Sequence, residues 1–167
     1  MIHLVCGPLG AGKTTVANEL SETYGAIRFS EDDWLNMLFV PEAPADLMDE
    51  SPDVIAHWAM DKYPRCREAI WNVCDQLLEQ DISIVLDGFA GTKALRDFVR
   101  SKAEAHRVAF QLYYVTADAD LRRKRVLERN TNKGSTFSLA VSSGMFDLME
   151  QHFEEPQKEE LQGAHII

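Results

Sequence analysis

Residues 7–14 read Gly-Pro-Leu-Gly-Ala-Gly-Lys-Thr, an order of residue types suited to holding a polyphosphate. The segment fits G-x-x-x-x-G-K-[ST] at every fixed position. Glycines let backbone N–H groups converge on phosphate oxygens, and the start of a helix adds partial positive charge. Lys13 would reach the β- and γ-phosphates, and the Thr14 hydroxyl would bind Mg²⁺. The alternative is a tight glycine turn with a solvated lysine, but the strand before and the helix after favour a nucleotide site. The residues expected to bind the nucleotide here are Gly7, Pro8, Leu9, Gly10, Ala11, Gly12, Lys13, Thr14 and Thr15.

Carboxylates follow the next two predicted strands. Asp32 and Asp33 come shortly after the apolar run Ala26–Phe29, and Asp87 directly follows the run Ile82–Leu86. In a doubly wound sheet, ligands bind beyond the carboxyl ends of the strands. We therefore expect these acids to open on the same crevice as the phosphate loop.

The position of each acid suggests a role. Asp87, on a strand beside the phosphate loop, suits Mg²⁺ binding with Thr14, or a substrate contact. Asp32 lies one strand further out, where an acceptor hydroxyl would lie, and suits the base that accepts its proton. Two structural alternatives stay open: Asp33 is only a helix cap, and Asp87 is only a turn residue before Gly88.

A basic segment, Leu121–Arg129, is predicted to be a helix on which Arg122, Arg125 and Arg129 share one face. Arginines on one stripe repel one another unless an anion collects there. A phosphoryl group in transfer is such an anion, because guanidinium groups stabilise its oxygens. The alternative is a solvated face paired with acids such as Glu128. Beside a phosphate loop we expect Arg125 and Arg129 to act on the nucleotide, and leave Arg122 open.

Apolar runs and helical periodicity predict the elements that carry these residues. Strands are predicted at Ile2–Cys6, Ala26–Phe29, Ile82–Leu86, Val108–Val115 and Ala164–Ile167. Helices are predicted at Lys13–Tyr24, Trp34–Leu38, Val54–Leu78 with an interruption at Pro64, Leu95–His106, Leu121–Arg129 and around Phe146–Phe153, with a loop at Pro41–Pro52 and another at Asn130–Ser135. Alternating strands and helices imply an α/β protein with a parallel sheet covered on both faces. We find no linker or repeat and expect one domain over residues 1–167.

The composition narrows the range of partners. The chain has 167 residues and a formal net charge of −10, with 46% hydrophobic residues. This balance argues against duplex DNA as a partner and against anionic membrane surfaces, both of which are bound by clustered Lys and Arg. A small phosphate site remains possible, because one loop and a few arginines can build it locally.

The cysteines and the apolar runs suggest the compartment. Cys6, Cys66 and Cys74 are too few and too scattered for a disulfide framework, so we expect them in the core. No apolar run reaches 18 residues and no cleavable leader is recognised. We expect a reduced, cytoplasmic protein. The sequence makes no prediction about oligomeric state.

Four features in this order resemble the small P-loop kinases: the phosphate loop, Ser30-x-Asp32, Val85-Leu-Asp87-Gly88, and Leu121-x-x-x-Arg125-x-x-x-Arg129-Asn130. That group includes bacterial ATP-dependent kinases of the zeta-toxin and chloramphenicol-phosphotransferase type, and the kinase domain of phage polynucleotide kinase. The similarity covers nearly the whole chain, because Phe153-Glu154-Glu155-Pro156 is similar to a Phe-Glu-Pro-Pro signature of many members. Glu155 in place of a proline and Glu31 beside the base are departures.

The resemblance implies a three-layer α/β/α sandwich of the P-loop NTPase fold, with a parallel five-stranded sheet in the order 2-3-1-4-5. It also implies a helical lid over about 119–137, whose Arg125 and Arg129 cover the transferred phosphoryl group. The resemblance further implies that Asp32 is the base that activates the acceptor hydroxyl. Ser30 and Asp33 then line the acceptor pocket.

The helical insert over about 34–78 is expected on the acceptor side. It contains Trp34 and Trp58, which are candidates for an aromatic wall of the acceptor pocket. Trp71 and Cys74, at helical spacing, are expected in the core.

The combined expectation is a phosphotransferase that uses ATP and Mg²⁺ and phosphorylates a hydroxyl of a small molecule. Its substrate residues would be Ser30, Asp32, Asp33, Trp34 and Asp87. One alternative is a 5′-hydroxyl polynucleotide kinase, which needs a basic track that the acidic stretch Glu42–Asp53 opposes. Another is a nucleotide-binding or ATPase switch module that serves a partner protein. The identity of the acceptor stays open among an antibiotic, a sugar, a nucleoside, an amine-bearing metabolite and a toxin-like substrate.

Overall fold

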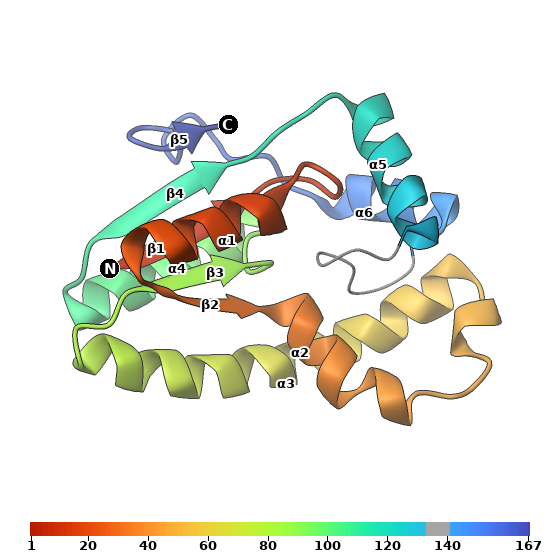
Figure 1. Ribbon diagram of the computed structural model, residues 1–167, viewed down its shortest axis with the longest axis horizontal. Coiled ribbons are helices and arrows are strands. Elements are labelled where there is room, and N and C mark those ends of the chain that lie inside the picture. The colour runs from red at the N-terminus through yellow and green to blue at the C-terminus, as the bar shows by residue number, and fades with distance from the viewer. Residues whose placement is uncertain (133–140) are drawn as a thin grey trace.

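In the computed structural model, which describes residues 1–132 and 141–167, five parallel strands form a sheet in the order β2-β3-β1-β4-β5 (Figure 1). The strands are β1 (Ile2–Cys6), β2 (Ile27–Ser30), β3 (Ile84–Asp87), β4 (Phe110–Tyr114) and β5 (His165–Ile166). The predicted sheet order is confirmed. The predicted second strand is shifted by one residue, and the predicted fourth strand is shorter at both ends.

Helices connect the strands and cover the sheet on both faces. They are α1 (Lys13–Tyr24), α2 (Glu31–Leu38), α3 (Pro52–Glu79), α4 (Lys93–His106), α5 (Ala119–Thr131) and α6 (Ser143–His152), with short 3-10 turns at Val40–Glu42 and Leu47–Asp49. Except for Val40, the two 3-10 turns lie in the segment predicted as a loop, Pro41–Pro52. Each helix connects parallel strands by the crossover that such pairing requires.

The alternation of side chains along β1 separates the two helical layers. Ile2, Leu4 and Cys6 point to the face covered by α3 and α4, where they join the main hydrophobic cluster. Val5 points to the opposite face, where it packs with Ala17 of α1. The predicted three-layer α/β/α sandwich is therefore confirmed. The three cysteines and Trp71, which were predicted to lie in the core, are also buried.

Helix α3 continues through Pro64, so the predicted interruption at this residue is wrong. Proline lacks an N–H group and its ring crowds the carbonyl of the residue four positions earlier, so it bends a helix that it does not end. Figure 1 shows the two halves of α3 running in different directions. The second half lies against the sheet, and the first half extends beside α2.

The predicted lid lies only partly in the described residues. Helix α5 begins at Ala119 and ends at Thr131. Residues 133–137 of the lid, and residues 133–135 of the predicted polar loop, lie outside the described part of the chain. Throughout residues 1–132 and 141–167, no helix combines the length and apolar character needed to cross a bilayer.

The segment after α6 is tied to α4 by one buried arginine. Arg96, 1% exposed, donates to both carboxylate oxygens of Glu160 at 2.7 and 3.0 Å. It also donates to the backbone carbonyls of Ala90 at 3.1 Å and Glu154 at 2.7 Å. These bonds hold the segment that resembles the Phe-Glu-Pro-Pro signature. The bond to Glu154 involves its backbone carbonyl and so does not depend on the side chain at position 155. It can therefore hold the segment although Glu155 replaces a proline.

This buried ion pair leads to a prediction about stability. Replacing Arg96 by Met is expected to lower the free energy of unfolding by about 3–5 kcal/mol, because Glu160 is left buried without its partner. Urea denaturation followed by circular dichroism measures the change. Lys124→Met is the control, since this side chain is 71% exposed and its loss is expected to cost less than about 0.5 kcal/mol. An Arg96→Met effect no larger than that of the control would show that the pair does not stabilise the fold.

Candidate active site

The phosphate loop between β1 and α1 depends on glycines that pack directly against other backbone. A Cβ atom at Gly7 would lie 2.1 Å from the carbonyl oxygen of Val115, which follows β4. A Cβ atom at Gly10 would lie 2.6 Å from the carbonyl oxygen of Arg122, and Gly10 also has a φ of +78°. Both positions therefore require glycine. The loop is held between the end of β4 and the first turn of α5.

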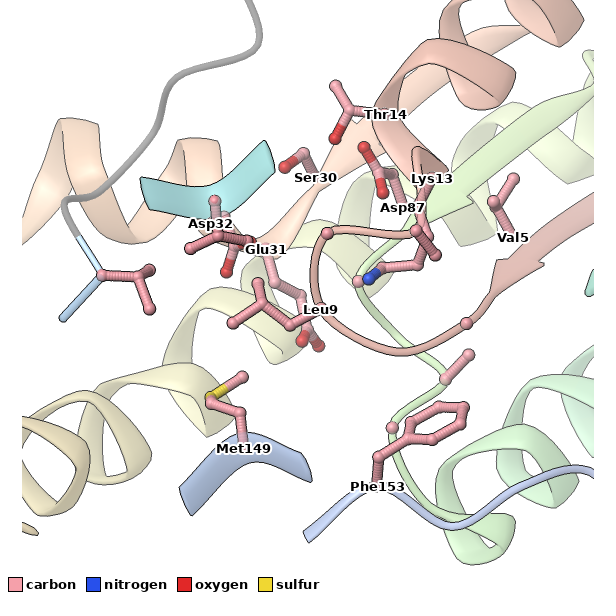
Figure 2. A pocket seen from close by; sticks show the side chains of 18 of the residues that line it. Val5, Leu9, Lys13, Thr14, Ser30, Glu31, Asp32, Asp87, Met149 and Phe153 are labelled. Atoms are coloured by element: carbon pink, nitrogen blue, oxygen red, sulfur yellow. The ribbon is translucent and has the colours of Figure 1, made fainter. Parts of the chain in front are cut away.

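Lys13, the first residue of α1, folds back across this loop. Its Nζ donates to the carbonyl oxygen of Pro8 at 3.0 Å. Burial lowers the pKa of the Lys13 ammonium, while the carboxylates of Asp87 and Asp32 act in the opposite direction. Figure 2 shows Lys13, Asp32 and Asp87 around the same space. The predicted meeting of the lysine with both acids is therefore present.

Asp87 ends β3 and is held by an arginine that the sequence reasoning missed. Arg28 of β2 donates from Nη2 to Asp87 at 2.8 Å and from Nη1 to Asp33 at 2.9 Å. The side chain of Asp87 is 5% exposed, whereas that of Asp33 is 46% exposed. The Arg28 guanidinium thus links Asp87, the last residue of β3, to Asp33 in the first turn of α2. A charged residue inside a short, otherwise apolar strand was the available signal.

The helix α2 is capped by Ser30, not by Asp33. The Ser30 hydroxyl accepts a hydrogen bond from the backbone N–H of Asp33 at 3.2 Å. This is the usual role of serine before a helix. Ser30 and Asp33 both line the cavity, so Ser30 combines this capping bond with the position predicted for it.

Asp32 projects into the cavity and is bound by a tyrosine of α3. The Tyr63 hydroxyl donates to Asp32 Oδ1 at 2.7 Å. Burial raises the pKa of the Asp32 carboxyl, while the bond from Tyr63 and the charge of Lys13 oppose that change. Tyr63 was not identified from the sequence. Its pairing with Asp32 spans 31 residues and leaves no local pattern.

The neighbouring Glu31 is held in a similar way. Arg67 Nε donates to Glu31 Oε1 at 2.5 Å, and Glu31 is only 3% exposed. Burial raises the pKa of Glu31 to about 7, although the bond from Arg67 opposes this. Each of the two acids that begin α2 therefore has its own partner on α3.

The three arginines of α5 do not behave as one group. Arg122 is buried and donates to Glu150 of α6 from both Nη atoms at 2.6 Å, and to the Leu9 carbonyl at 3.1 Å. Arg125 and Arg129 instead line the cavity. No carboxylate in the described part of the chain lies within ion-pair distance of either. Arg122 thus fastens α5, and the other two remain available to an anion.

The predicted role of Trp34 in an aromatic wall is wrong. Trp34 packs against the main hydrophobic cluster under the sheet and does not line the cavity. The three acids that precede it in α2, Glu31, Asp32 and Asp33, line the cavity instead. Trp58 does line the cavity, as predicted.

Apart from Arg122, Glu150 and Trp34, the side chains described above border one cavity of about 1240 Å³. The phosphate loop and α5 form its nucleotide side, and α2 with the first half of α3 forms the side on which Asp32 lies. Apolar side chains from the insert and from α6 complete the lining: Ile55, Met60, Leu148, Met149 and Phe153. This volume exceeds that of many single-ligand pockets and accommodates a nucleotide together with a second small molecule.

The cavity offers few groups that could bind a magnesium ion. Among the described residues, no cluster of three or more His, Cys, Asp or Glu side chains is arranged to hold a metal ion. Mg²⁺ that arrives with a nucleotide needs only one or two protein oxygens, because phosphates and waters supply the rest. Thr14 and Asp87 line the same cavity and satisfy that requirement.

One curated relative matches most of the chain. Adenylate kinase 9 of Mus musculus is 26% identical over 149 residues, which cover 84% of this chain and 7% of that protein. This chain therefore spans about 7% of the length of that relative.

Solved structures share the fold at low sequence identity. A protein from Chloroflexus aurantiacus assigned as a kinase superposes with a TM-score of 0.74 at 15% identity, over 99% of this chain and 83% of that one. A gluconokinase from Sinorhizobium meliloti superposes with a TM-score of 0.62 at 18% identity, over 99% of this chain and 80% of that one. Both likenesses concern the fold alone.

A family model described as an AAA domain matches residues 2–156, which is nearly the whole chain. The resemblance to small P-loop kinases that the sequence motifs predict is thereby confirmed. The chain belongs to this AAA domain family and has the fold of the P-loop kinases.

Proposed function

We propose that this chain is an ATP- and Mg²⁺-dependent kinase that phosphorylates a hydroxyl group of a small molecule. One observation carries the proposal: Lys13 and Asp32 line the same cavity, the first within the phosphate loop and the second on the side formed by α2 and α3. A phosphate-binding lysine and a carboxylate that accepts the proton of the hydroxyl are two of the groups that recur in phosphoryl transfer to a hydroxyl.

The phosphate side of the cavity is suited to stabilising negative charge. Lys13 and the backbone N–H groups of the loop bind the β- and γ-phosphates, with the start of α1 adding its partial positive charge. Thr14 and Asp87 would hold Mg²⁺, which when bound would neutralise part of the negative charge of the phosphates. Arg125 and Arg129 contact the equatorial oxygens of the γ-phosphoryl group from α5.

Asp32 supplies the base. The acceptor hydroxyl gives its proton to Asp32 while its oxygen forms a bond to the γ-phosphorus. The bond from that phosphorus to the β,γ-bridging oxygen breaks, and ADP leaves with the bond's electron pair. Burial raises the pKa of Asp32 and so makes its carboxylate a stronger base than an exposed aspartate.

The charge of the chain supports a small acceptor. The formal net charge is −10, and the side of the cavity around Asp32 carries further acids. A long polyanion would be repelled there, whereas one nucleotide needs only Lys13 and the α5 arginines. Two of the similar proteins are named for small-molecule kinase activities, a gluconokinase and an adenylate kinase, which agrees with this class.

The role of Asp32 is testable by substitution. With Mg-ATP and pooled small-molecule alcohols, Asp32→Asn is expected to lower acceptor-dependent ADP release by about 10²–10⁴-fold, because the proton acceptor is lost. ATP binding, measured by calorimetry, is expected to persist. Asp97→Asn removes an exposed carboxylate of α4 and serves as the matched control.

The outcomes separate the candidate functions. Acceptor-dependent release that is unchanged in Asp32→Asn would rule out the kinase mechanism. Slow ATP hydrolysis that needs no acceptor and has the same rate in Asp32→Asn would favour an ATPase module. Transfer to a 5′-hydroxyl oligonucleotide that weakens steeply with salt would favour a polynucleotide kinase. Lys13→Ala loses nucleotide binding under every one of these functions and tests only the phosphate loop.

The lid arginines lead to a second prediction. Arg125→Ala is expected to lower kcat by about 100-fold or more, with a smaller change in KM for ATP, because its guanidinium acts mainly on charge that develops during transfer. Lys124→Ala, one position earlier and largely exposed, is expected to leave kcat within about twofold of the unaltered protein. Equal rates for both variants would contradict a role for Arg125 in transfer.

A further inference from the structure

Tyr63 and Arg67 lie one helical turn apart on α3, and each contacts one of the adjacent acids that begin α2. Tyr63 Oη lies 2.7 Å from Asp32 Oδ1, and Arg67 Nε lies 2.5 Å from Glu31 Oε1. Residues four apart on a helix share one face. One face of α3 therefore binds the consecutive side chains of Glu31 and Asp32. In the described part of the chain, no other helix donates a side-chain hydrogen bond to either of them.

The bond from Tyr63 uses only one oxygen of Asp32. Within the described residues, Oδ1 accepts from Tyr63 and Oδ2 accepts no hydrogen bond. An aspartate side chain rotates about two torsions, and a bond to one oxygen restricts both. The free oxygen thus has a fixed direction in the cavity.

We infer that Tyr63 is a positioning residue, whose hydroxyl holds the Asp32 carboxylate so that Oδ2 is presented to the acceptor hydroxyl. This inference rests on the proposed function, in which Asp32 is the base. Positioning matters because proton transfer requires the base within about 2.6–3.2 Å of the hydroxyl oxygen. An unrestrained carboxylate would spend part of its time turned away.

Tyr63 is suited to this task because it stays a donor. Burial and the charge of Asp32 raise the pKa of the Tyr63 hydroxyl well above its usual value, so it remains protonated. Its bond also favours the ionised form of Asp32 and so lowers the pKa that burial raises. Tyr63 therefore affects both the direction and the proton affinity of the base.

The bend in α3 explains how Tyr63 reaches Asp32. Pro64 follows Tyr63 directly within α3, and a proline inside a helix is the usual cause of a bend. The half of α3 that precedes the bend does not cover the sheet and runs beside α2, as Figure 1 shows. Tyr63 lies at the junction, next to α2.

Other charged groups also act on Asp32. The charged groups are Lys13 of α1, Asp87 of β3, and Glu31 and Asp33 of α2, and the neutral hydroxyl of Tyr63 of α3 acts beside them. All except Tyr63 remain unchanged when Tyr63 loses only its hydroxyl. Tyr63→Phe keeps the ring and its packing, so this variant isolates the single hydrogen bond.

Tyr63→Phe is expected to lower kcat by about 10- to 100-fold, the effect of losing one hydrogen bond to a charged group, while KM for ATP stays the same. The acid limb of kcat/KM against pH is expected to move to higher pH, because the Asp32 carboxylate loses a bond that stabilises its charge. A merely structural tyrosine would not move that limb. Tyr24→Phe, at the far end of α1 from the phosphate loop, is the matched control.

A double variant tests whether Tyr63 acts through Asp32. If it does, Tyr63→Phe combined with Asp32→Asn is no slower than Asp32→Asn alone. Additive losses, or a Tyr63→Phe variant with the kcat and pH profile of the unaltered protein, would overturn the inference. These outcomes differ from failure of the proposed function, in which Asp32→Asn itself keeps its acceptor-dependent activity.

Discussion

The parallel register of the three strands β1, β3 and β2 is the constraint on which the site depends. Val5 pairs with Asp87, and Asp87 in turn pairs with Ser30, so three strands end at the same level. The phosphate loop, the Asp87 carboxylate and the start of α2 must therefore emerge side by side. A shift of register by one residue would turn Asp87 to the other face of the sheet and separate it from the loop.

This convergence brings several acids into one partly buried space, which is costly unless each has a partner. The chain meets that cost with groups from outside the recognised motifs. Arg28 binds Asp33 and Asp87, Arg67 binds Glu31, and Tyr63 binds Asp32. The partner of Asp32 is a neutral hydroxyl. It therefore satisfies the carboxylate without cancelling the negative charge that the proposed role of Asp32 as a base requires.

Much of the fold follows from local patterns, because strand and helix periods and the glycine-rich loop are local properties. The sheet order was implied by the resemblance to the small P-loop kinases, whereas the alternation of strands and helices and the positions of Asp32 and Asp87 followed from these local patterns. The partners did not, since Arg28–Asp87 spans 59 residues, Arg67–Glu31 spans 36 and Tyr63–Asp32 spans 31. The error at Trp34 has the same origin: the face that α2 turns to the core depends on contacts with α3 and the sheet. The predicted interruption at Pro64 was wrong because a helix can bend at a proline and still continue.

The arginines of helix α5 have two kinds of surroundings. Arg122 binds Glu150 of α6 and the Leu9 carbonyl, and its own carbonyl packs against Gly10. The base of α5 is thus fastened to the phosphate loop itself. Arg125 and Arg129 lie further along the same helix and face the cavity without a carboxylate partner in the described residues. Because one end of α5 is fixed to the phosphate loop, Arg125 and Arg129 keep a defined position relative to that loop. These two arginines of an acidic chain thus line the same cavity as Lys13, where the proposed nucleotide would bind.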